Sequence, residues 1–221
     1  MIAKPFIKYD IGGGYHWKWY LVNFDGYRDF TNNLVDLIPK AGRLLDVGCG
    51  DGLISYLFFR SGFDVVGIDT SETGIQLAKM VSEKALRESL GADVKDVQET
   101  PYTEGDLGLM IERFDAGALQ YSNHSIYDLT EADSFDYAIC SEVIEHLKHP
   151  EQLLENVQRA IRNFAIITTP DGLQPDGTIE EPGAYDFYAW SPETFAELLK
   201  GYKFEFLDLR PDTISVKLFK S

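Results

Sequence analysis

The sequence predicts an α/β fold with a doubly wound, seven-stranded, mostly parallel sheet, an antiparallel C-terminal hairpin and an N-terminal helical cover. Two observations support this prediction. Between residues 43 and 169, short apolar runs typical of strands alternate with segments of helical periodicity, which favours parallel strands joined by crossover helices. Near the C-terminus, the apolar runs 203–209 and 215–219 are separated by a short turn with Pro211 and Asp212, so they should pair antiparallel.

Residues 1–42 precede the first clear strand and form the expected N-terminal aromatic cover, which belongs to the same domain as residues 43–221. The triplet Gly12-Gly13-Gly14 predicts a turn or a hinge. After it, apolar residues recur at helical spacing from Tyr27 to Ile38, and Pro39 and Gly42 should end that helix.

The central segment contains the expected alternation. We predict strands at 43–47, 64–68, 118–121, 137–140 and 164–168, and helices at 52–61, 71–89, 107–114 and 144–161. Ser71 should cap its helix at the N-terminus. The polar, turn-rich part of 91–115 is interpreted as an insertion near the edge of the sheet.

A long acidic segment rich in glycine and proline, 171–189, follows the fifth predicted strand. Loops of this length often act as functional lids. Ser191, Pro192 and Glu193 then form a typical helix start, with serine as the N-cap, proline in the first turn and an acidic residue after it.

The composition narrows the class of protein. With 44% hydrophobic residues, the 221-residue chain can bury a sizeable core. A net charge of −16 without a run of basic residues argues against nucleic acid as a partner. No apolar run approaches the roughly 18 residues of a membrane span, and residues 1–10 lack a signal-peptide core. Since Cys49 and Cys140 form no disulfide framework, a cytoplasmic location is expected; the oligomeric state is not predicted.

A glycine-rich loop, Asp46-Val47-Gly48-Cys49-Gly50-Asp51-Gly52, follows the first predicted strand and begins a helix. Its glycines permit a tight turn and close approach of the backbone to a ligand. Dinucleotide sites usually read G-x-G-x-x-G, whereas three glycines alternate here beside two acids. Those carboxylates would repel a pyrophosphate. They favour a ligand such as S-adenosylmethionine (SAM), which carries an amino group and a sulfonium.

Asp69 ends the second predicted strand. Eighteen residues separate it from Gly50, the length of one helix plus one strand, so it should lie beside the glycine loop. A carboxylate there can accept hydrogen bonds from both hydroxyls of a ribose. Alone, Asp69 could equally be a turn residue at a strand end, and its pairing with the loop favours the ribose role.

These motifs resemble the class I (Rossmann-like) SAM-dependent methyltransferases, in particular the type 11/12 group. Leu44 to Leu53 is similar to the first motif, 67–69 to the second, 125–129 to the adenine-contacting loop after strand three, and 135–147 to the fourth motif with its following helix. The resemblance covers about residues 43–169. It implies strand order 3-2-1-4-5-7-6, a methyltransferase domain at 43–221, SAM as cofactor and S-adenosylhomocysteine as product.

The resemblance also implies a set of cofactor-binding residues. Those around the methionine part of SAM are Asp46, Gly48, Cys49, Gly50, Asp51, Gly52 and Leu53. At the ribose and adenine they are Asp69, Thr70, Ser125 and Ile126, where Ser125 replaces the aspartate that the family often has. Ser141 and Glu142 should lie under the sulfonium.

His146, with Glu142 and Glu145, is the candidate catalytic group. A general base is needed only where the accepting O–H or N–H must lose its proton. By spacing, Glu142, Glu145, His146 and His149 should share one helical face. In one interpretation, His146 packs near the cofactor. In the other, Glu142, Glu145 and His146 bind a divalent metal, as in the small-RNA 2′-O-methyltransferases and ubiquinone-pathway O-methyltransferases that this stretch resembles. The RNA enzymes supply a further histidine after strand five, and none follows His149 here, so we predict no metal.

Two aromatic segments, 15–20 and 185–190, should form the acceptor pocket, because the superfamily builds it from the N-terminal segment and the region after strand five. Tyr15 and His16 follow the glycine hinge and are candidate lid residues over SAM, although these aromatics could equally pack on the sheet. We therefore predict methyl transfer to an O or N atom of a small-molecule acceptor. The alternatives are a metal-assisted RNA 2′-O-methyltransferase, a SAM-binding homologue without catalysis and, less favoured by the glycine spacing, a nicotinamide oxidoreductase.

Overall fold

A computed structural model describes residues 8–38, 40–89, 119–130 and 132–221. The predicted helix 107–114 and the insertion at 91–115 lie outside these ranges, as does Ala118, the first residue of the predicted third strand. In the described part of the chain, no helix is long and apolar enough to cross a membrane.

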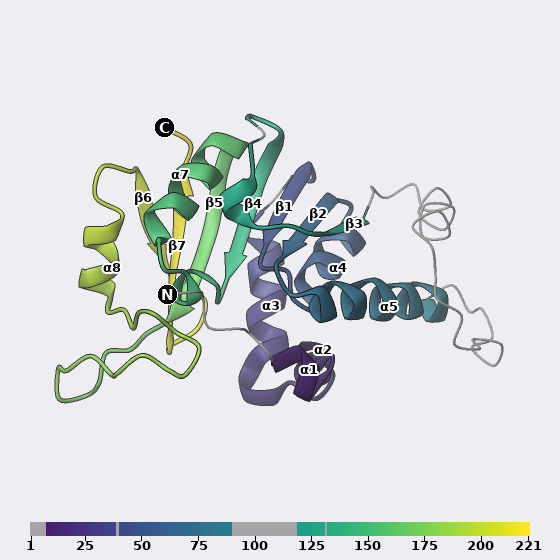
Figure 1. Ribbon diagram of the computed structural model, residues 1–221, viewed down its shortest axis with the longest axis horizontal. Helices are drawn as coiled ribbons and strands as arrows, with labels where there is room; N and C mark the ends of the chain where they lie inside the picture. Colours follow the sequence, from purple (N-terminus) through teal and green to yellow (C-terminus); the bar gives the residue numbers. More distant parts are fainter. Residues whose placement is uncertain (1–7, 39, 90–118, 131) are drawn as a thin grey trace.

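A seven-stranded sheet in the order β3-β2-β1-β4-β5-β7-β6 forms the centre of the molecule (Figure 1). Its parallel strands are β1 (Arg43–Val47), β2 (Asp64–Asp69), β3 (Leu119–Asn123), β4 (Phe135–Ser141) and β5 (Ile161–Pro170). β6 (Phe204–Leu207) and β7 (Thr213–Phe219) form an antiparallel hairpin, and β7 also pairs with β5. The predicted fold class and strand order are confirmed.

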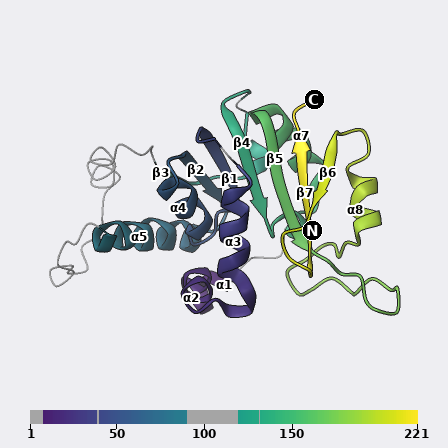
Figure 2. The same cartoon turned by 180° about the vertical axis from the view of Figure 1, so that it is seen from behind.

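Helices cover both faces of the sheet (Figures 1 and 2). α3 (Tyr27–Asp36), α4 (Leu53–Arg60) and α5 (Glu72–Ser89) pack on one face, and α7 (Pro150–Ala160) and α8 (Pro192–Leu198) on the other. Successive strand residues point to opposite faces. In β1, for example, Leu44 belongs to the core beneath α3 to α5, whereas Leu45 belongs to the core beneath α7 and α8. The strands are therefore apolar on both sides, as expected for a buried parallel sheet.

The predicted helix starts at Ser71 and Ser191 are confirmed. The Ser71 hydroxyl accepts a hydrogen bond from Gly74 N at 3.0 Å, which caps α5. Ser191 and Thr194 form a reciprocal capping box at the start of α8. These contacts satisfy backbone amides that have no partner inside the helix.

The N-terminal cover lies beyond the carboxyl ends of the central strands (Figure 1). It consists of α1 (Lys8–Gly12), α2 (Tyr15–Val22) and the 3₁₀ turn η1 (Phe24–Gly26), which leads directly into α3. Gly13 separates α1 from α2 with a φ of +60°, which agrees with the turn expected at the glycine triplet.

The predicted helix 144–161 is wrong at both ends. Residues 144–146 form a 3₁₀ turn, η4 (Ile144–His146), and the α-helix begins only at Pro150. A residue before proline is disfavoured in the helical region, and His149 has φ −127°. Ile161 already belongs to β5. The expectation that Glu142, Glu145, His146 and His149 share one helical face is therefore also wrong.

Candidate active site

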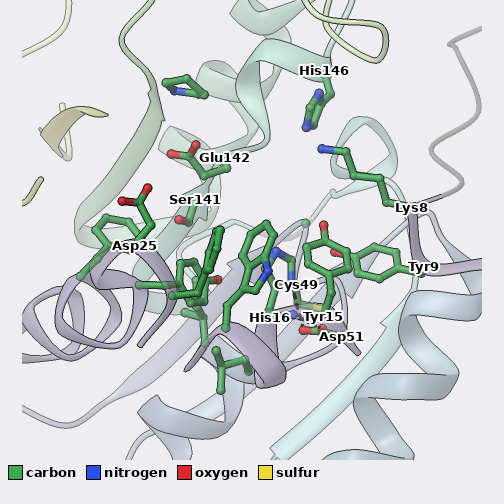
Figure 3. Close-up of a pocket in the computed structure, with 18 of the residues that line it drawn as sticks. Lys8, Tyr9, Tyr15, His16, Asp25, Cys49, Asp51, Ser141, Glu142 and His146 are labelled. Carbon is green, nitrogen blue, oxygen red and sulfur yellow. Dashed lines mark hydrogen bonds and ion pairs between the residues drawn. The ribbon is translucent and has the colours of Figure 1, made fainter. Parts of the chain in front are cut away.

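A cavity of about 320 Å³ lies at the carboxyl ends of β1 and β4, under the N-terminal cover (Figure 3). Most of the predicted site residues line it together: Asp46, Gly48, Cys49, Asp51, Leu53, Ser141, Glu142, Glu145, His146, Tyr15 and His16. Six others do not line it: Gly50, Gly52, Asp69, Thr70, Ser125 and Ile126. The predicted catalytic groups thus face one space with part of the glycine loop, and the predicted ribose and adenine residues do not line it.

The glycine loop connects β1 to α4, and its conformation requires glycine. Gly48 has a φ of +70°, and a Cβ on it would lie 2.3 Å from Val143 Cγ2. Gly50 has a φ of +54°, and a Cβ there would lie 1.8 Å from the hydroxyl of Tyr9. Gly48 N and Cys49 N both donate to Ile68 O, at 2.7 and 3.0 Å, and so tie the loop to β2. The backbone is therefore open to close approach, and Tyr9 of the cover uses that opening at Gly50.

The two acids of the loop are buried and have different partners. Asp46 accepts a hydrogen bond from Ser55 Oγ at 2.5 Å, and burial raises the pKa of its carboxyl to about 7. Asp51 accepts a hydrogen bond from His16 N at 3.0 Å, and its other carboxylate oxygen lies 3.1 Å from His16 Nδ1. Trp17 Nε1 donates to Asp51 O at 2.8 Å. Asp51 thus fixes the start of α2 onto the glycine loop.

Asp69 lies beside the glycine loop, as its spacing predicts. Its carboxylate accepts hydrogen bonds from Gly50 N at 2.9 Å and from Ser71 N at 2.7 Å. Burial raises the pKa of this carboxyl. A carboxylate has about four lone-pair positions, so two bonds from the backbone leave acceptor capacity for a ligand hydroxyl.

Residues 123–126 are held against the end of β2, next to Asp69. His124 N and Asn123 Nδ2 both donate to Asp69 O, at 3.1 and 3.0 Å. Ser125 Oγ accepts from Tyr127 N at 3.2 Å and caps the 3₁₀ turn η3 (Ile126–Asp128), while Ile126 is buried in the core. Thr70 is exposed beside them. The structure therefore groups the predicted ribose and adenine residues near the carboxyl ends of β2 and β3.

Glu145 is buried and Glu142 is half-buried, and each carboxylate receives a hydrogen bond from a threonine of β5. Thr168 Oγ1 donates to Glu142 Oε1 and Thr169 Oγ1 donates to Glu145 Oε2, both at 3.0 Å. Burial raises the pKa of Glu142 to about 7 and also raises the pKa of Glu145. Glu142 has a φ of +55°, a left-handed conformation that is strained for a residue with a Cβ.

His146 faces the same cavity, and its Nδ1 lies 2.7 Å from Asp186 Oδ1. Burial lowers the pKa of the imidazole, and the charge of Asp186 opposes that shift. The loop that carries Asp186 is held in place by Phe187 N, which donates to Glu145 O at 2.8 Å.

Aromatic rings of the cover form one wall of the cavity. Tyr15 stacks on Tyr9 with ring centroids 5.5 Å apart, and His16 stacks on Tyr27 at 5.7 Å. Trp19 packs edge-on against Tyr15 and Tyr27, at 4.9 and 5.6 Å. Burial raises the pKa of Tyr15 to about 12, so its hydroxyl stays protonated.

Among the residues that line the cavity, Lys8, Tyr9, Asp25 and Arg210 have no site role in the sequence-based prediction, and Asp186 enters it only as part of the segment 185–190. The position of Asp186 inside the aromatic segment 185–190 was the only available signal for it. Asp25 and Arg210 are far apart in sequence, and Arg210 Nη2 donates to Asp25 Oδ2 at 2.6 Å.

The alternative metal site is not found. In the part of the chain that the structure describes, no group of three or more His, Cys, Asp or Glu side chains could hold a metal ion. Glu142 and Glu145 accept hydrogen bonds from threonines instead, and His146 turns its Nδ1 to Asp186.

A doubly wound sheet in this strand order, with an acid-flanked glycine loop after its first strand, defines a Rossmann-like methyltransferase fold. The methyltransferase domain family matches residues 22–208, which is most of the chain. The chain belongs to this family.

Two curated relatives have less than 30% sequence identity to this chain and are longer than it. The ubiquinone biosynthesis O-methyltransferase of Cereibacter sphaeroides is 27% identical over 175 residues, which are 78% of this chain and 52% of that protein. The enzyme of the same name from Pasteurella multocida is 26% identical over 125 residues, 57% of this chain and 44% of that protein. The chain spans about half the length of these curated relatives.

Solved structures share the fold. The magnesium protoporphyrin IX methyltransferase of Synechocystis PCC 6803, crystallised with bound SAM, superimposes with a TM-score of 0.60 at 15% identity. The likeness covers 97% of this chain and 94% of that one, so the fold extends through the N-terminal cover.

Proposed function

We propose that the chain transfers the methyl group of SAM to an O or N atom of a small molecule that binds under the N-terminal cover. The observation that carries this proposal is the cavity itself, which runs from the glycine loop to Glu142, His146 and Asp186. Its volume of about 320 Å³ is at the scale of small-molecule sites. The names of the curated relatives, which are O-methyltransferases, support an acceptor of this size.

Bound SAM would supply an electrophilic methyl group on a sulfonium, and this chain's residues would hold it in place. Asp46 at the loop is a hydrogen-bond acceptor for the amino group, and Asp69 is the acceptor for the ribose hydroxyls. Tyr15 and His16, fixed by Asp51, cover the cavity and keep water out. Alignment of the reactants and exclusion of water provide much of the rate of such a displacement.

Two side chains at the other end of the cavity are suited to take the acceptor's proton. Asp186 orients the imidazole of His146, whose lowered pKa keeps it neutral at pH 7. Glu142 has a pKa of about 7, and a base is most effective when its pKa lies near the working pH.

The proposal is tested by calorimetric titration with SAM and with NAD, followed by a measurement of S-adenosylhomocysteine release in a panel of phenol, catechol and amine acceptors. We expect binding of SAM alone and release with at least one small acceptor. Release only with RNA, abolished by a chelator, would contradict the proposal in favour of the metal-assisted RNA enzyme. SAM binding without transfer to any acceptor would favour a non-catalytic homologue.

A further inference from the structure

We propose that the acceptor is a cationic amine, a small molecule in which an ammonium group is joined to an apolar or aromatic body. This inference rests on the proposed function and names the substrate class of the same cavity. Its support is the pairing of acidic side chains with an aromatic wall in one cavity.

The cavity has more acidic than basic side chains. Six carboxylates line it, from Asp25, Asp46, Asp51, Glu142, Glu145 and Asp186, and two permanent cations, Lys8 and Arg210. Arg210 is already held by Asp25 and by Asp212, whose Oδ1 lies 2.8 Å from Arg210 Nε. SAM itself has a net charge of only one positive unit, so acidic side chains still outnumber cations after it binds. Because the pKa values of Asp46, Glu142 and Glu145 are raised by burial, a further cation beside them would favour their ionised forms.

Among the described residues, Glu142 has no cation in direct contact, although the charge of Arg210 acts on it from a greater distance. Its side chain points into the cavity (Figure 3). Its hydrogen bond comes from the neutral Thr168, and it forms no ion pair with any lysine or arginine that the structure describes. A largely desolvated carboxylate without a cation in direct contact is costly, and an ammonium group placed beside it would offset that cost.

The aromatic wall faces the same space. Trp19 stacks on Phe24 with centroids 5.6 Å apart, and together with Tyr27 and Tyr15 these rings line the cavity. Faces of Trp, Tyr and Phe attract cations through the ring quadrupole. Aromatic faces combined with carboxylates are the pairing that recognises an organic ammonium ion and offers little to an anionic acceptor.

A second hollow of about 390 Å³ lies outside the cavity, between the start of α3 and the turn at 209–212. The two share Asp25, Phe30 and Arg210, so the Asp25–Arg210 ion pair stands between them. Asp29 and Asp212 add further negative charge to the outer hollow. Three carboxylates against one arginine leave the hollow with a net negative charge, which raises the local concentration of cationic ligands. This is the route that we assign to the acceptor.

The chemical step balances with this acceptor. The ammonium group gives one proton to the carboxylate of Glu142 and becomes a neutral amine. The nitrogen lone pair forms a bond to the methyl carbon of SAM as the C–S bond breaks and its electron pair stays on sulfur. The products are an N-methylammonium ion and S-adenosylhomocysteine, and Glu142 returns its proton to solvent.

The test is calorimetric titration of the complex with S-adenosylhomocysteine, using three probes of matched shape: 2-phenylethylammonium, 2-phenylethanol and 3-phenylpropanoate. We expect the ammonium ion to bind at least roughly tenfold more tightly than either of the others, as for a partly buried charge pair. Equal or weaker binding of the ammonium ion, or none, would overturn the inference.

Glu142→Gln is the matching variant, and Asp36→Asn, at the exposed far end of α3, is its control. Glu142→Gln should weaken binding of the ammonium ion roughly tenfold more than binding of 2-phenylethanol, both measured on the complex with S-adenosylhomocysteine. An equal loss for 2-phenylethanol would show a merely structural role. If the wild-type chain binds S-adenosylhomocysteine but prefers the alcohol, the amine inference is wrong while the proposed function still stands. If it binds neither SAM nor S-adenosylhomocysteine, the proposed function fails.

Discussion

His146 Nδ1 lies 2.7 Å from Asp186 Oδ1, although the two residues come from opposite sides of β5 in the sequence. A carboxylate at Nδ1 favours the tautomer with the proton on that nitrogen, which leaves Nε2 as the proton acceptor. The same carboxylate stabilises the imidazolium once it forms. Asp186 therefore acts through His146, as a positioning residue.

Asp186→Asn should lower kcat for an acceptor that must lose a proton, by roughly 10- to 100-fold. Since Asp186 raises the pKa of His146 against the effect of burial, the acidic limb of the kcat profile should move to lower pH in the variant. Steady-state kinetics between pH 5 and pH 9 measure both effects. Glu181→Gln, in the same loop and exposed, is the control. An unchanged pH profile would remove Asp186 from this role.

Asp46 should make the cofactor-free protein less stable as the pH rises. Burial raises its pKa to about 7 in the folded state, whereas the unfolded value is about 4. Between these values the folded state binds the extra proton, so the free energy of unfolding falls with rising pH, by up to about 1.4 kcal/mol per pH unit. Urea unfolding at pH 5, 6 and 7 should show this slope in the wild-type chain and a smaller slope in Asp46→Asn. Parallel slopes would contradict the assignment.

Tyr15→Ala should weaken SAM binding or slow turnover, by roughly tenfold if the ring helps to close the cavity. The ring stacks on Tyr9 and packs against Trp19 and His16, so its loss opens the aromatic wall. Tyr15→Phe keeps the stacking and should behave as wild type. Leu21→Ala, on the exposed side of α2, controls for effects on the helix. Unchanged kinetics of Tyr15→Ala would exclude the lid role.

Asp69→Asn should weaken the binding of SAM by one to two powers of ten. The site loses a charged acceptor, and the amide can accept only one of the two backbone hydrogen bonds that the carboxylate accepts; together these losses are worth roughly 1–3 kcal/mol. The wild-type carboxylate accepts from Gly50 N and Ser71 N. Calorimetry with SAM measures the change, and Asp64→Asn at the other end of β2 is the control. Equal SAM affinity in the two variants would show that Asp69 orders the loop without touching the ribose.

The sheet could be predicted well from the sequence because each strand and turn is defined by residues that are close together in the chain. Short apolar runs define the parallel strands, and the short turn at Pro211 and Asp212 defines the hairpin. The position of Asp69 beside Gly50 followed from counting one helix and one strand. The same locality explains the incorrect helix 144–161: its apolar residues have helical spacing, but Pro150 disfavours a helical backbone at His149.

Contacts between distant segments could not be predicted in this way. The pairs His146–Asp186 and Asp25–Arg210 join segments whose meeting depends on how two loops fold over the sheet. The left-handed backbone at Glu142 also has no sequence signal, since glutamate is not a residue that favours that region.

At position 142, the residue that would make the fold most stable differs from the residue that the proposed reaction needs, because the backbone of Glu142 is strained. A left-handed non-glycine residue costs roughly 1–3 kcal/mol, and the largely desolvated carboxylate adds to that cost. Glycine and asparagine tolerate this backbone conformation, so selection for heat resistance alone would favour them at position 142. Selection for thermal stability would therefore remove the carboxylate that faces the cavity, so position 142 should be kept unchanged when the protein is stabilised by mutation.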